Sequence, residues 1–123
     1  MAMTTRILSV SIPVTDQDAA LRFYVDVLGC DLRTDLEVWP GARLVEVVPP
    51  GSDVGFVLLS PDSEIPMAVR MGTSDADTAY RRLRDADVQI HNEEVIHLDG
   101  SPPMFFFADP DGNGLVYLQE TDS

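Results

Sequence analysis

The stretch VTDQDAALRFYVDVLGCDL, residues 14–32, runs from the end of one strand pattern through a helix pattern into the next strand. Thr15-x-x-Asp18 has the spacing of a capping box, in which two side chains satisfy free amides at the start of a helix. Gly29 supplies a stop signal. Apolar residues recur between them at helical spacing: Ala20, Phe23, Tyr24, Val27 and Leu28. The stretch therefore predicts an amphipathic helix packed on a sheet.

Strand patterns flank this helix on both sides. Residues 7–14, ILSVSIPV, alternate between apolar and small or polar side chains, which indicates a strand with one buried face. Three further strand-like segments follow at 30–38, 42–48 and 54–60, separated by the turn-rich sequences WPG and PPGSD. The first half of the chain therefore predicts the order βαβββ.

The second half repeats this order. A strand is predicted at 67–71, and the capping box Ser74-x-x-Asp77 opens a second helix. Strands are then predicted at 88–96, 103–108 and 114–119. When the chain is shifted by 59 residues, Thr15 falls on Ser74, Asp18 on Asp77 and Arg22 on Arg81. We therefore expect an α+β fold of duplicated βαβββ modules, at about 6–60 and 65–120, in a single domain of 123 residues.

Two motifs resemble one protein superfamily. Residues 14–32 and FFADPDGNGLVYLQ, residues 106–119, are similar to the vicinal oxygen chelate superfamily, which includes glyoxalase I, bleomycin-resistance proteins and extradiol dioxygenases. The resemblance covers the whole chain, and the two motifs lie at opposite ends of the repeat. It implies that the two modules form a curved mixed sheet around a ligand cavity, often completed by a second subunit.

The resemblance also implies where a metal would bind. Metal-dependent members carry His, Gln or Glu on the first and last strands of each module. The corresponding positions here are Ser9 and Val57 in the first module and Ala68 and Val116 in the second. Divalent transition metals need imidazole, thiolate or carboxylate groups that converge on one point. We therefore expect no metal site and no cofactor.

A second candidate metal site is the segment 109–120, DPDGNGLVYLQE, which matches the pattern of calcium-binding EF-hand loops. An EF-hand loop joins two helices, whereas this segment follows MFFFA and leads into another strand pattern. The alternative is a tight turn in which Asp and Asn side chains hydrogen-bond the backbone and glycines accept positive φ. The β context favours the turn.

A third candidate is the group His91, Glu93, Glu94 and His97, whose side chains are chemically adequate metal ligands. Polar residues on both faces of the predicted strand favour a solvated edge instead. Cys30 is interpreted as a small buried hydrophobe, because no basic group lies nearby to activate a thiolate. No G-x-S-x-G elbow or P-loop occurs.

Strand alternation selects the candidate ligand-binding residues. Ser9 and Ser11 should face away from the first helix. In the second module the same parity places Met67, Val69 and Met71 against the helix, with Ala68 and Arg70 facing the cavity. Arg70 then needs a carboxylate partner, for which Glu46 is the best internal candidate, or an anionic ligand. The alternative is that Arg70 lies at a cavity mouth and pairs with a surface acid.

Aromatic residues are further candidates. Trp39 lies at a turn between strands, where it could roof a pocket, cover the sheet's open end or pack in a dimer contact. Alternation sends Phe106 to one face of its strand, and Phe105 and Phe107 to the other. The complete predicted ligand-binding set is Ser9, Ser11, Trp39, Glu46, Val57, Arg70, Phe106 and Val116.

Charge and composition limit the partners. The net charge is −13 and the eight basic residues are all arginine, so we expect no binding to nucleic acid or anionic membranes. No run approaches the roughly 20 apolar residues of a membrane helix, and the start lacks a secretory signal. The lone cysteine favours a reducing cytoplasm. Apolar strands such as FVLLS and MFFFA need cover, so we expect a homodimer.

Two function hypotheses follow. The first is a metal-independent protein that binds a small molecule, like the drug-sequestering members of the superfamily. The second is a metal-independent isomerase, lyase or hydrolase that acts on a small metabolite, including anionic ones, and uses Glu46, Arg70 or a serine. An accessory protein with neither role stays open. The sequence favours the binding protein, and it does not identify the ligand.

Overall fold

The structure, a computed structural model, describes residues 5–97 and 99–120. It divides into two compact units. The first, which we call the first module, spans residues 8–67, and the second module runs from residue 68 and includes the first residues of β1. In the described part of the chain, no helix has the length and apolar character needed to cross a membrane.

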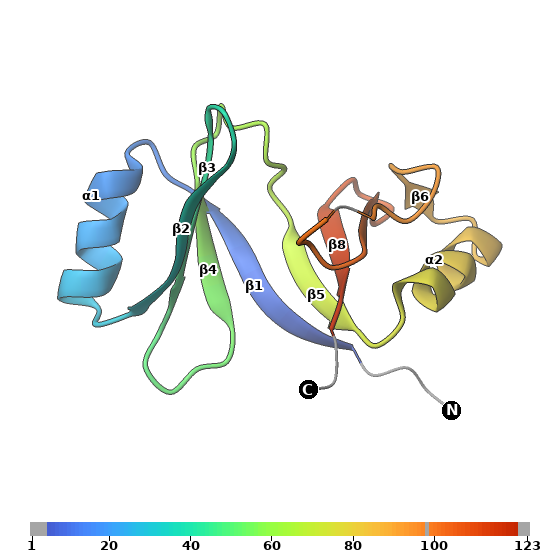
Figure 1. The fold of residues 1–123 in the computed structure, drawn as a ribbon, viewed down its shortest axis with the longest axis horizontal. Helices are drawn as coiled ribbons and strands as arrows, with labels where there is room; N and C mark the ends of the chain where they lie inside the picture. Colours follow the sequence, from blue (N-terminus) through green and yellow to red (C-terminus); the bar gives the residue numbers. More distant parts are fainter. Residues whose placement is uncertain (1–4, 98, 121–123) are drawn as a thin grey trace. The chain divides into compact units, whose positions relative to one another are not determined.

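The first module has the predicted order of elements (Figure 1). Its sheet has the order β2-β3-β4-β1, in which β1 and β4 are parallel and the other neighbours antiparallel. The elements are β1 (Thr5–Pro13), α1 (Gln17–Leu21), η1 (Arg22–Val27), β2 (Asp31–Trp39), β3 (Ala42–Val48) and β4 (Gly55–Leu59). The predicted strands are therefore confirmed to within about two residues at each end.

Both helices begin one residue later than the predicted capping boxes require. Asp16 is the N-cap of α1, and its Oδ1 accepts a hydrogen bond of 3.0 Å from the amide of Ala19. Asp75 caps the second helix in the same way, accepting 3.1 Å from the amide of Thr78. Aspartate is a strong N-cap residue. Its carboxylate accepts a hydrogen bond from a backbone amide that has no partner within the helix, and its negative charge interacts favourably with the positive end of the helix dipole. The predicted caps at Thr15 and Ser74 are therefore wrong by one position.

The first helix changes its winding part-way. Figure 1 shows α1 and η1 as one continuous coil beside the sheet, and η1 is a π-helix. A π-helix bonds each residue to the fifth along, so the buried stripe shifts from the one that α-helical spacing predicts. Phe23, Val27 and Leu28 are exposed, Val27 by 70%. The side chains that pack on the buried core of Cys30, Val45, Val47 and Leu58 include Ala20, Leu21, Tyr24 and Val25.

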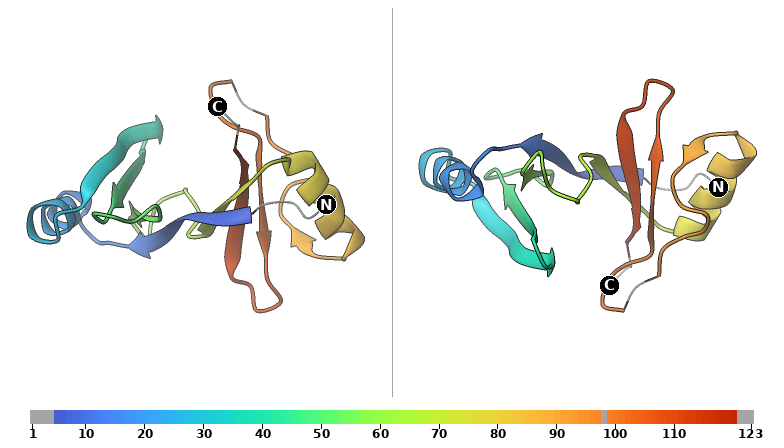
Figure 2. Two further views of the ribbon diagram at one scale, coloured as in Figure 1. Left: turned by 90° about the horizontal axis from the view of Figure 1, so that it is seen from below. Right: turned by 90° about the horizontal axis from the view of Figure 1, so that it is seen from above.

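The second module repeats the arrangement. Its sheet has the order β5-β8-β7-β6, with β5 and β8 parallel, and both views of Figure 2 show the β7–β8 pair as adjacent strands. The elements are β5 (Val69–Thr73), α2 (Ala76–Asp85), β6 (Gln89–Ile90), β7 (Met104–Ala108) and β8 (Gly114–Gln119). The α+β class and the duplicated order are confirmed.

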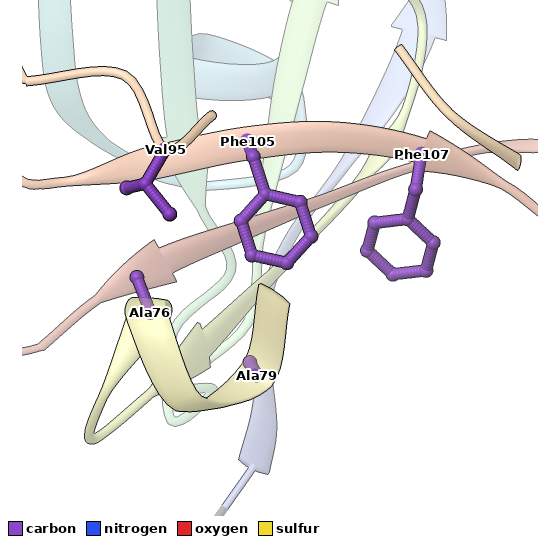
Figure 3. Close-up of a cluster of buried hydrophobic side chains, with 5 residues drawn as sticks. All are labelled: Ala76, Ala79, Val95, Phe105 and Phe107. Carbon is purple, nitrogen blue, oxygen red and sulfur yellow. The ribbon is translucent and has the colours of Figure 1, made fainter. Parts of the chain in front are cut away.

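The core of the second module is aromatic. Phe105 and Phe107 project from β7 toward α2, where they meet Ala76 and Ala79 (Figure 3). The rings of Tyr80 and Phe105 pack edge to face, with centroids 5.1 Å apart. Alanine on the helix leaves room for these rings, so α2 sits close to the sheet.

Two predictions for the second module are wrong. The strand expected over 88–96 shrinks to β6 and one isolated bridge from Ile96 to Met104. The cause is Asn92, whose Oδ1 accepts 2.7 Å from the amide of Phe106, so a side chain replaces a ladder bond. The strand expected from Met67 begins at Val69, and Met67 is exposed instead of packing on α2.

Candidate functional site

One face of each module's sheet packs on its helix, and we call the opposite face the helix-free face. In β3, Val45 and Val47 belong to the helix-side core, so Glu46 between them lies on the helix-free face. Glu46 pairs with Val57, which pairs with Ser11 in β1. Ser9 lies on the same face two residues earlier. Strand parity therefore predicted the face of Ser9 and Ser11 correctly.

Two β-bulges bring further side chains to this face. Between Leu32 and Thr34 the register of β2 against β3 shifts by one, so Arg33 is an extra, unpaired residue. The second shift places Trp39 opposite Ala42, on the same face as Glu46. In a strand without this register shift, the Trp39 side chain would lie on the helix side of the sheet. Sequence reasoning missed Arg33, since nothing in a single sequence marks a bulge.

Glu46 and Arg33 meet above Gly55. Glu46 Oε2 lies 3.6 Å from Arg33 Nη1, and the two side chains are 15% and 41% exposed. A Cβ atom placed on Gly55 would lie 3.1 Å from Glu46 Oε2 and 3.2 Å from Arg33 Nη2. The two charged groups therefore fill the space over Gly55 that a side chain at residue 55 would need.

Ser9 borders the same position. It pairs with Gly55 across the parallel β1–β4 ladder, and the residue is 1% exposed. Among residues 5–97 and 99–120, no hydrogen-bond partner exists for its Oγ. A buried polar group without a partner costs about 1–3 kcal/mol. We call Ser9, Arg33, Glu46 and Gly55 the Gly55 cluster.

An apolar strip continues from this cluster along the hairpin of β2 and β3. Leu36 pairs with Leu44 two residues beyond the Thr34–Glu46 pair, and Trp39 follows at the end of the ladder. Trp39 Nε1 donates 2.8 Å to Glu64 Oε2 in the segment that follows β4, which fixes the indole ring. Leu36 and Trp39 are both exposed. We call Leu36, Leu44 and Trp39 the hairpin strip.

The second module presents a different set on its helix-free face. Arg70 pairs with Val116, and Val116 pairs with Phe106, so these three form one row across β5, β8 and β7. Their neighbours Met71, Phe105 and Tyr117 pack on the helix side. The predicted faces of Arg70 and Phe106 are therefore correct. Whether they contact a ligand stays a prediction.

The second module contains another arginine–glutamate pair, which joins Arg6 in β1 to Glu120 just after β8. Arg6 Nε donates 3.1 Å to both carboxylate oxygens of Glu120, and Arg6 Nη2 donates 2.6 Å to Oε1. The Glu120 side chain lies over Gly72, where a Cβ would clash with it. The hydrogen bonds from Arg6 lower the pKa of Glu120 below its ordinary value. Sequence analysis did not identify this pair.

The Asp109 segment is a turn between β7 and β8. Asp109 Oδ1 accepts from the amides of Asp111 at 3.0 Å and Asn113 at 2.8 Å, and Oδ2 accepts 2.7 Å from Asn113 Nδ2. These bonds lower the pKa of the Asp109 carboxyl, with the Asn113 contacts as the main cause. Gly112 has φ +87°, which glycine adopts without strain. The turn interpretation is confirmed.

The donor set at the family's metal positions does not fit a divalent ion. One hydroxyl and three hydrocarbon side chains stand there, on Ser9, Val57, Ala68 and Val116. His91, Glu93, Glu94 and His97 are all exposed, as a solvated segment predicts. Within the described residues, no group of three His, Cys, Asp or Glu side chains is arranged to hold a metal.

Comparison with known proteins supports the fold and the family. A family model described as the Glyoxalase/Bleomycin resistance protein/Dioxygenase superfamily matches residues 6–117. The chain belongs to this superfamily. The resemblance inferred from the two motifs is thereby confirmed. No curated protein matches the chain.

Solved structures share the fold at low identity. A hypothetical protein from Bacillus halodurans C-125 matches with a TM-score of 0.79 and 18% identity, over 98% of this chain and 97% of that one. Methylmalonyl-CoA epimerase from Mycobacterium tuberculosis matches at 0.77 and 24%, over 94% and 88%. A Streptomyces coelicolor methylmalonyl-CoA epimerase variant in complex with 2-nitronate-propionyl-CoA matches at 0.75 and 20%, over 98% and 100%. These likenesses show the fold and not a shared chemistry.

Proposed function

We propose that this chain is a metal-independent small-molecule-binding protein of the glyoxalase/bleomycin-resistance type. One observation carries the proposal: the helix-free face of the first module combines the loosely paired Arg33 and Glu46 side chains, 3.6 Å apart, with the exposed apolar side chains of Leu36 and Trp39. An ion pair longer than about 2.9 Å keeps hydrogen-bonding capacity for a further group. A bound molecule would use this capacity and cover the apolar side chains.

The proposed contacts lie on the helix-free faces. In the first module they are Ser9, Ser11, Trp39, Glu46 and Val57. In the second module they are Arg70, Phe106 and Val116. Both sets combine apolar side chains with a few polar groups, which is typical of small-molecule sites.

Native mass spectrometry of the purified chain tests this function. We expect a low-molecular-weight species bound to the wild type and lost from the variant Ser9→Ala,Glu46→Gln. The control is Ser74→Ala,Glu93→Gln, which changes the same residue types at exposed positions and should retain the species. A wild type that carries nothing, and binds nothing from a fragment library, contradicts the proposal.

Metal independence is tested by thermal melting after chelation. Excess zinc, nickel, manganese or calcium should leave the melting temperature nearly unchanged, because a ligand that binds the native state must raise it. A saturable rise that disappears in Asp109→Ala or His91→Ala would overturn this part of the proposal.

Arg70 gives a prediction for the second module. We propose that it binds an acidic group, because a guanidinium donates two parallel hydrogen bonds to a carboxylate or phosphate. Arg70→Ala should weaken binding of an anionic ligand by roughly tenfold to a hundredfold, and Arg70→Lys should restore it in part. An affinity indifferent to Arg70→Ala would make the residue structural.

We further propose a cytoplasmic homodimer. Cys30 is a free thiol buried in the first-module core, which suits a reducing compartment. Exposed apolar side chains on β2 and η1 leave surface for a partner copy. Sedimentation at micromolar concentration should show twice the 13.5 kDa chain mass, and a purely monomeric species would contradict the dimer.

An enzyme is the second candidate, favoured by the geometry of Glu46. A carboxylate that is 15% exposed and held by one ion pair of 3.6 Å could accept a proton from a bound metabolite. An isomerase, lyase or hydrolase of this kind would lose turnover in Glu46→Gln while still binding its substrate. A binding protein would lose affinity and have no turnover to lose.

A further inference from the structure

The helix of the first module exposes large apolar side chains. Phe23, Val27 and Leu28 are 48%, 70% and 49% exposed. Neither α1 nor η1 contains a buried residue, whereas α2 buries Ala76 and Ala79 against its sheet. Solvent therefore reaches apolar side chains on the first helix that a folded chain ordinarily covers.

The internal repeat shows that the fold does not require these apolar side chains. When the chain is shifted by 59 residues, Phe23 falls on Arg82, Val27 on Ala86 and Leu28 on Asp87. These three residues of the second module are all exposed. The second module thus packs its helix with charged or small residues at the same outer positions. Clustered apolar side chains on a solvated surface usually mark a contact with another molecule.

The three apolar side chains lie on one side of η1. The amide of Leu28 donates 3.0 Å to the carbonyl of Phe23, five residues earlier, which is the bond of a π-helix. Because a π turn is wider than an α turn, residues four and five apart both lie near one face, so Val27 and Leu28 follow Phe23 there. The Phe23 ring packs edge to face on Tyr24, with centroids 5.3 Å apart, which restricts its motion. We call Phe23, Val27 and Leu28 the η1 patch.

Two opposite charges border the η1 patch. Arg22 and Asp26 are both exposed, and their spacing of four places them on one flank of the helix. In the part of the chain that the structure describes, neither side chain forms an ion pair. Both charges are therefore available to a partner.

This arrangement fits a second copy of the same chain. When two copies of a helix pack antiparallel about a two-fold axis, the same flank of each helix faces its counterpart with the residue order reversed. Arg22 of each copy then lies opposite Asp26 of the other, so the contact contains two pairs of opposite charges. Each chain has a net charge of −13, which otherwise opposes association, so a contact that pairs charges locally is favoured over one that does not.

We propose that two copies of this chain associate through their η1 patches, with the helices antiparallel and Arg22 of each copy paired with Asp26 of the other. The apolar side chains of the patch lose contact with water, and an aromatic anchor such as Phe23 contributes strongly to interfaces of this kind. This inference rests on the homodimer proposed above and names the surface that forms it.

The test measures the dissociation constant of the dimer by sedimentation of the full chain over a range of concentrations. Arg22→Asp gives a flank with two acidic residues, and Asp26→Arg gives a flank with two basic ones. The matched controls are Arg81→Asp and Asp85→Arg, which change the counterparts of these residues in α2, 59 positions along the chain. Both control positions are exposed.

We expect Arg22→Asp and Asp26→Arg each to weaken the dimer about tenfold, because two attractive contacts become repulsive. An equimolar mixture of the two variants should form a heterodimer with nearly the wild-type affinity, since each acidic flank then meets a basic one. A change within one helix cannot produce this recovery. Val27→Asp, which places a charge inside the patch, should weaken the dimer about a hundredfold, and circular dichroism should show that its fold is intact.

A dimeric wild type whose dissociation constant is unchanged in Val27→Asp would overturn the η1 surface and leave the proposed homodimer standing. A mixture of Arg22→Asp and Asp26→Arg that stays as weak as either variant alone would overturn the antiparallel pairing. Equal weakening in the α2 controls would show a general charge effect and also overturn the inference. A wild type that stays monomeric at every concentration would count against the proposed homodimer itself.

Discussion

The two arginine–glutamate pairs use the same chemistry in opposite ways. Arg6 and Glu120 form three hydrogen bonds, the shortest 2.6 Å, with side chains 54% and 35% exposed. Arg33 and Glu46 approach to 3.6 Å, and Glu46 is the more buried carboxylate. Each glutamate lies over a glycine, Gly72 in one module and Gly55 in the other.

We propose that this difference separates a structural contact from a ligand-binding contact. In the Arg6–Glu120 pair, both carboxylate oxygens of Glu120 accept hydrogen bonds from Arg6. The carboxylate therefore has little hydrogen-bonding capacity left for a third group. The Arg33–Glu46 pair is longer, at 3.6 Å, and its carboxylate is more shielded from solvent. Hydrogen bonds to a desolvated charge are worth more than those to an exposed one, so ligand binding should depend on the Arg33–Glu46 pair.

The largest expected effect comes from filling the two glycines. In Gly55→Ala the new methyl group would lie 3.0 Å from the carbonyl oxygen of Val47, a backbone atom that cannot swing away. We expect a loss of about 1–3 kcal/mol in the free energy of unfolding, measured in urea. In Gly72→Ala the obstacle is the Glu120 side chain, which can rotate outward. That loss should stay below about 1 kcal/mol, the range of an exposed ion pair.

Equal losses for the two glycine variants would mean that the Val47 backbone yields to a methyl group as readily as the Glu120 side chain does, against the account of a tightly packed Gly55 position.

A smaller effect is expected from Ser9→Ala. On ligand-free protein, removing a buried hydroxyl that has no partner should raise the free energy of unfolding by about 1 kcal/mol. Ser74→Ala, at an exposed position, should change it by less than about 0.5 kcal/mol. Urea denaturation of both variants and the wild type measures this. A loss of stability in Ser9→Ala would show that the hydroxyl is already satisfied in the free protein.

The smallest effect concerns pH. The pKa of Glu120 is lowered in the folded state, chiefly by hydrogen bonds from Arg6. Its contribution to stability is therefore present above the unfolded-state pKa and is lost as pH falls through the folded-state pKa. Because the pair is exposed, the contribution should be about 0.2–1 kcal/mol. The difference in unfolding free energy between wild type and Glu120→Gln should shrink on acidification from neutral pH to about 3.

Comparison with the wild type isolates Glu120, because Asp35, Asp75 and Asp109 also have lowered pKa values and remain in both proteins. A difference that stays constant across the pH range would mean that Arg6 does not stabilise the charged form of Glu120.

Much of the fold follows from sequence patterns with a clear physical cause. The period-two alternation of ILSVSIPV correctly predicted that Ser9 and Ser11 oppose Ile12, which packs on the helix side. The same reasoning separated Phe106 from Phe105 and Phe107. Alternation is reliable where one face of a strand is buried, because a slip of one residue would expose the whole apolar set.

The features that shape the candidate site were less visible. Arg33 and Trp39 reach the helix-free face through β-bulges, which add one residue without any compositional signal. The π-helix shifted the buried stripe away from Phe23 and Val27 in the same way. Whether Ser9 Oγ has a hydrogen-bond partner depends on all the side chains packed around it. The residues next to Ser9 in the sequence could therefore not predict that it lacks one.

A crystal structure of the full chain with its co-purified ligand retained tests the central claim most directly. We expect density for a small molecule on the helix-free face of the first module, in hydrogen-bond contact with Glu46 or Arg33 and packed against Leu36 and Trp39. The Arg6–Glu120 pair should remain closed and carry no ligand. An Arg33–Glu46 pair closed to about 2.8 Å, with no ligand density on this face, would contradict the account.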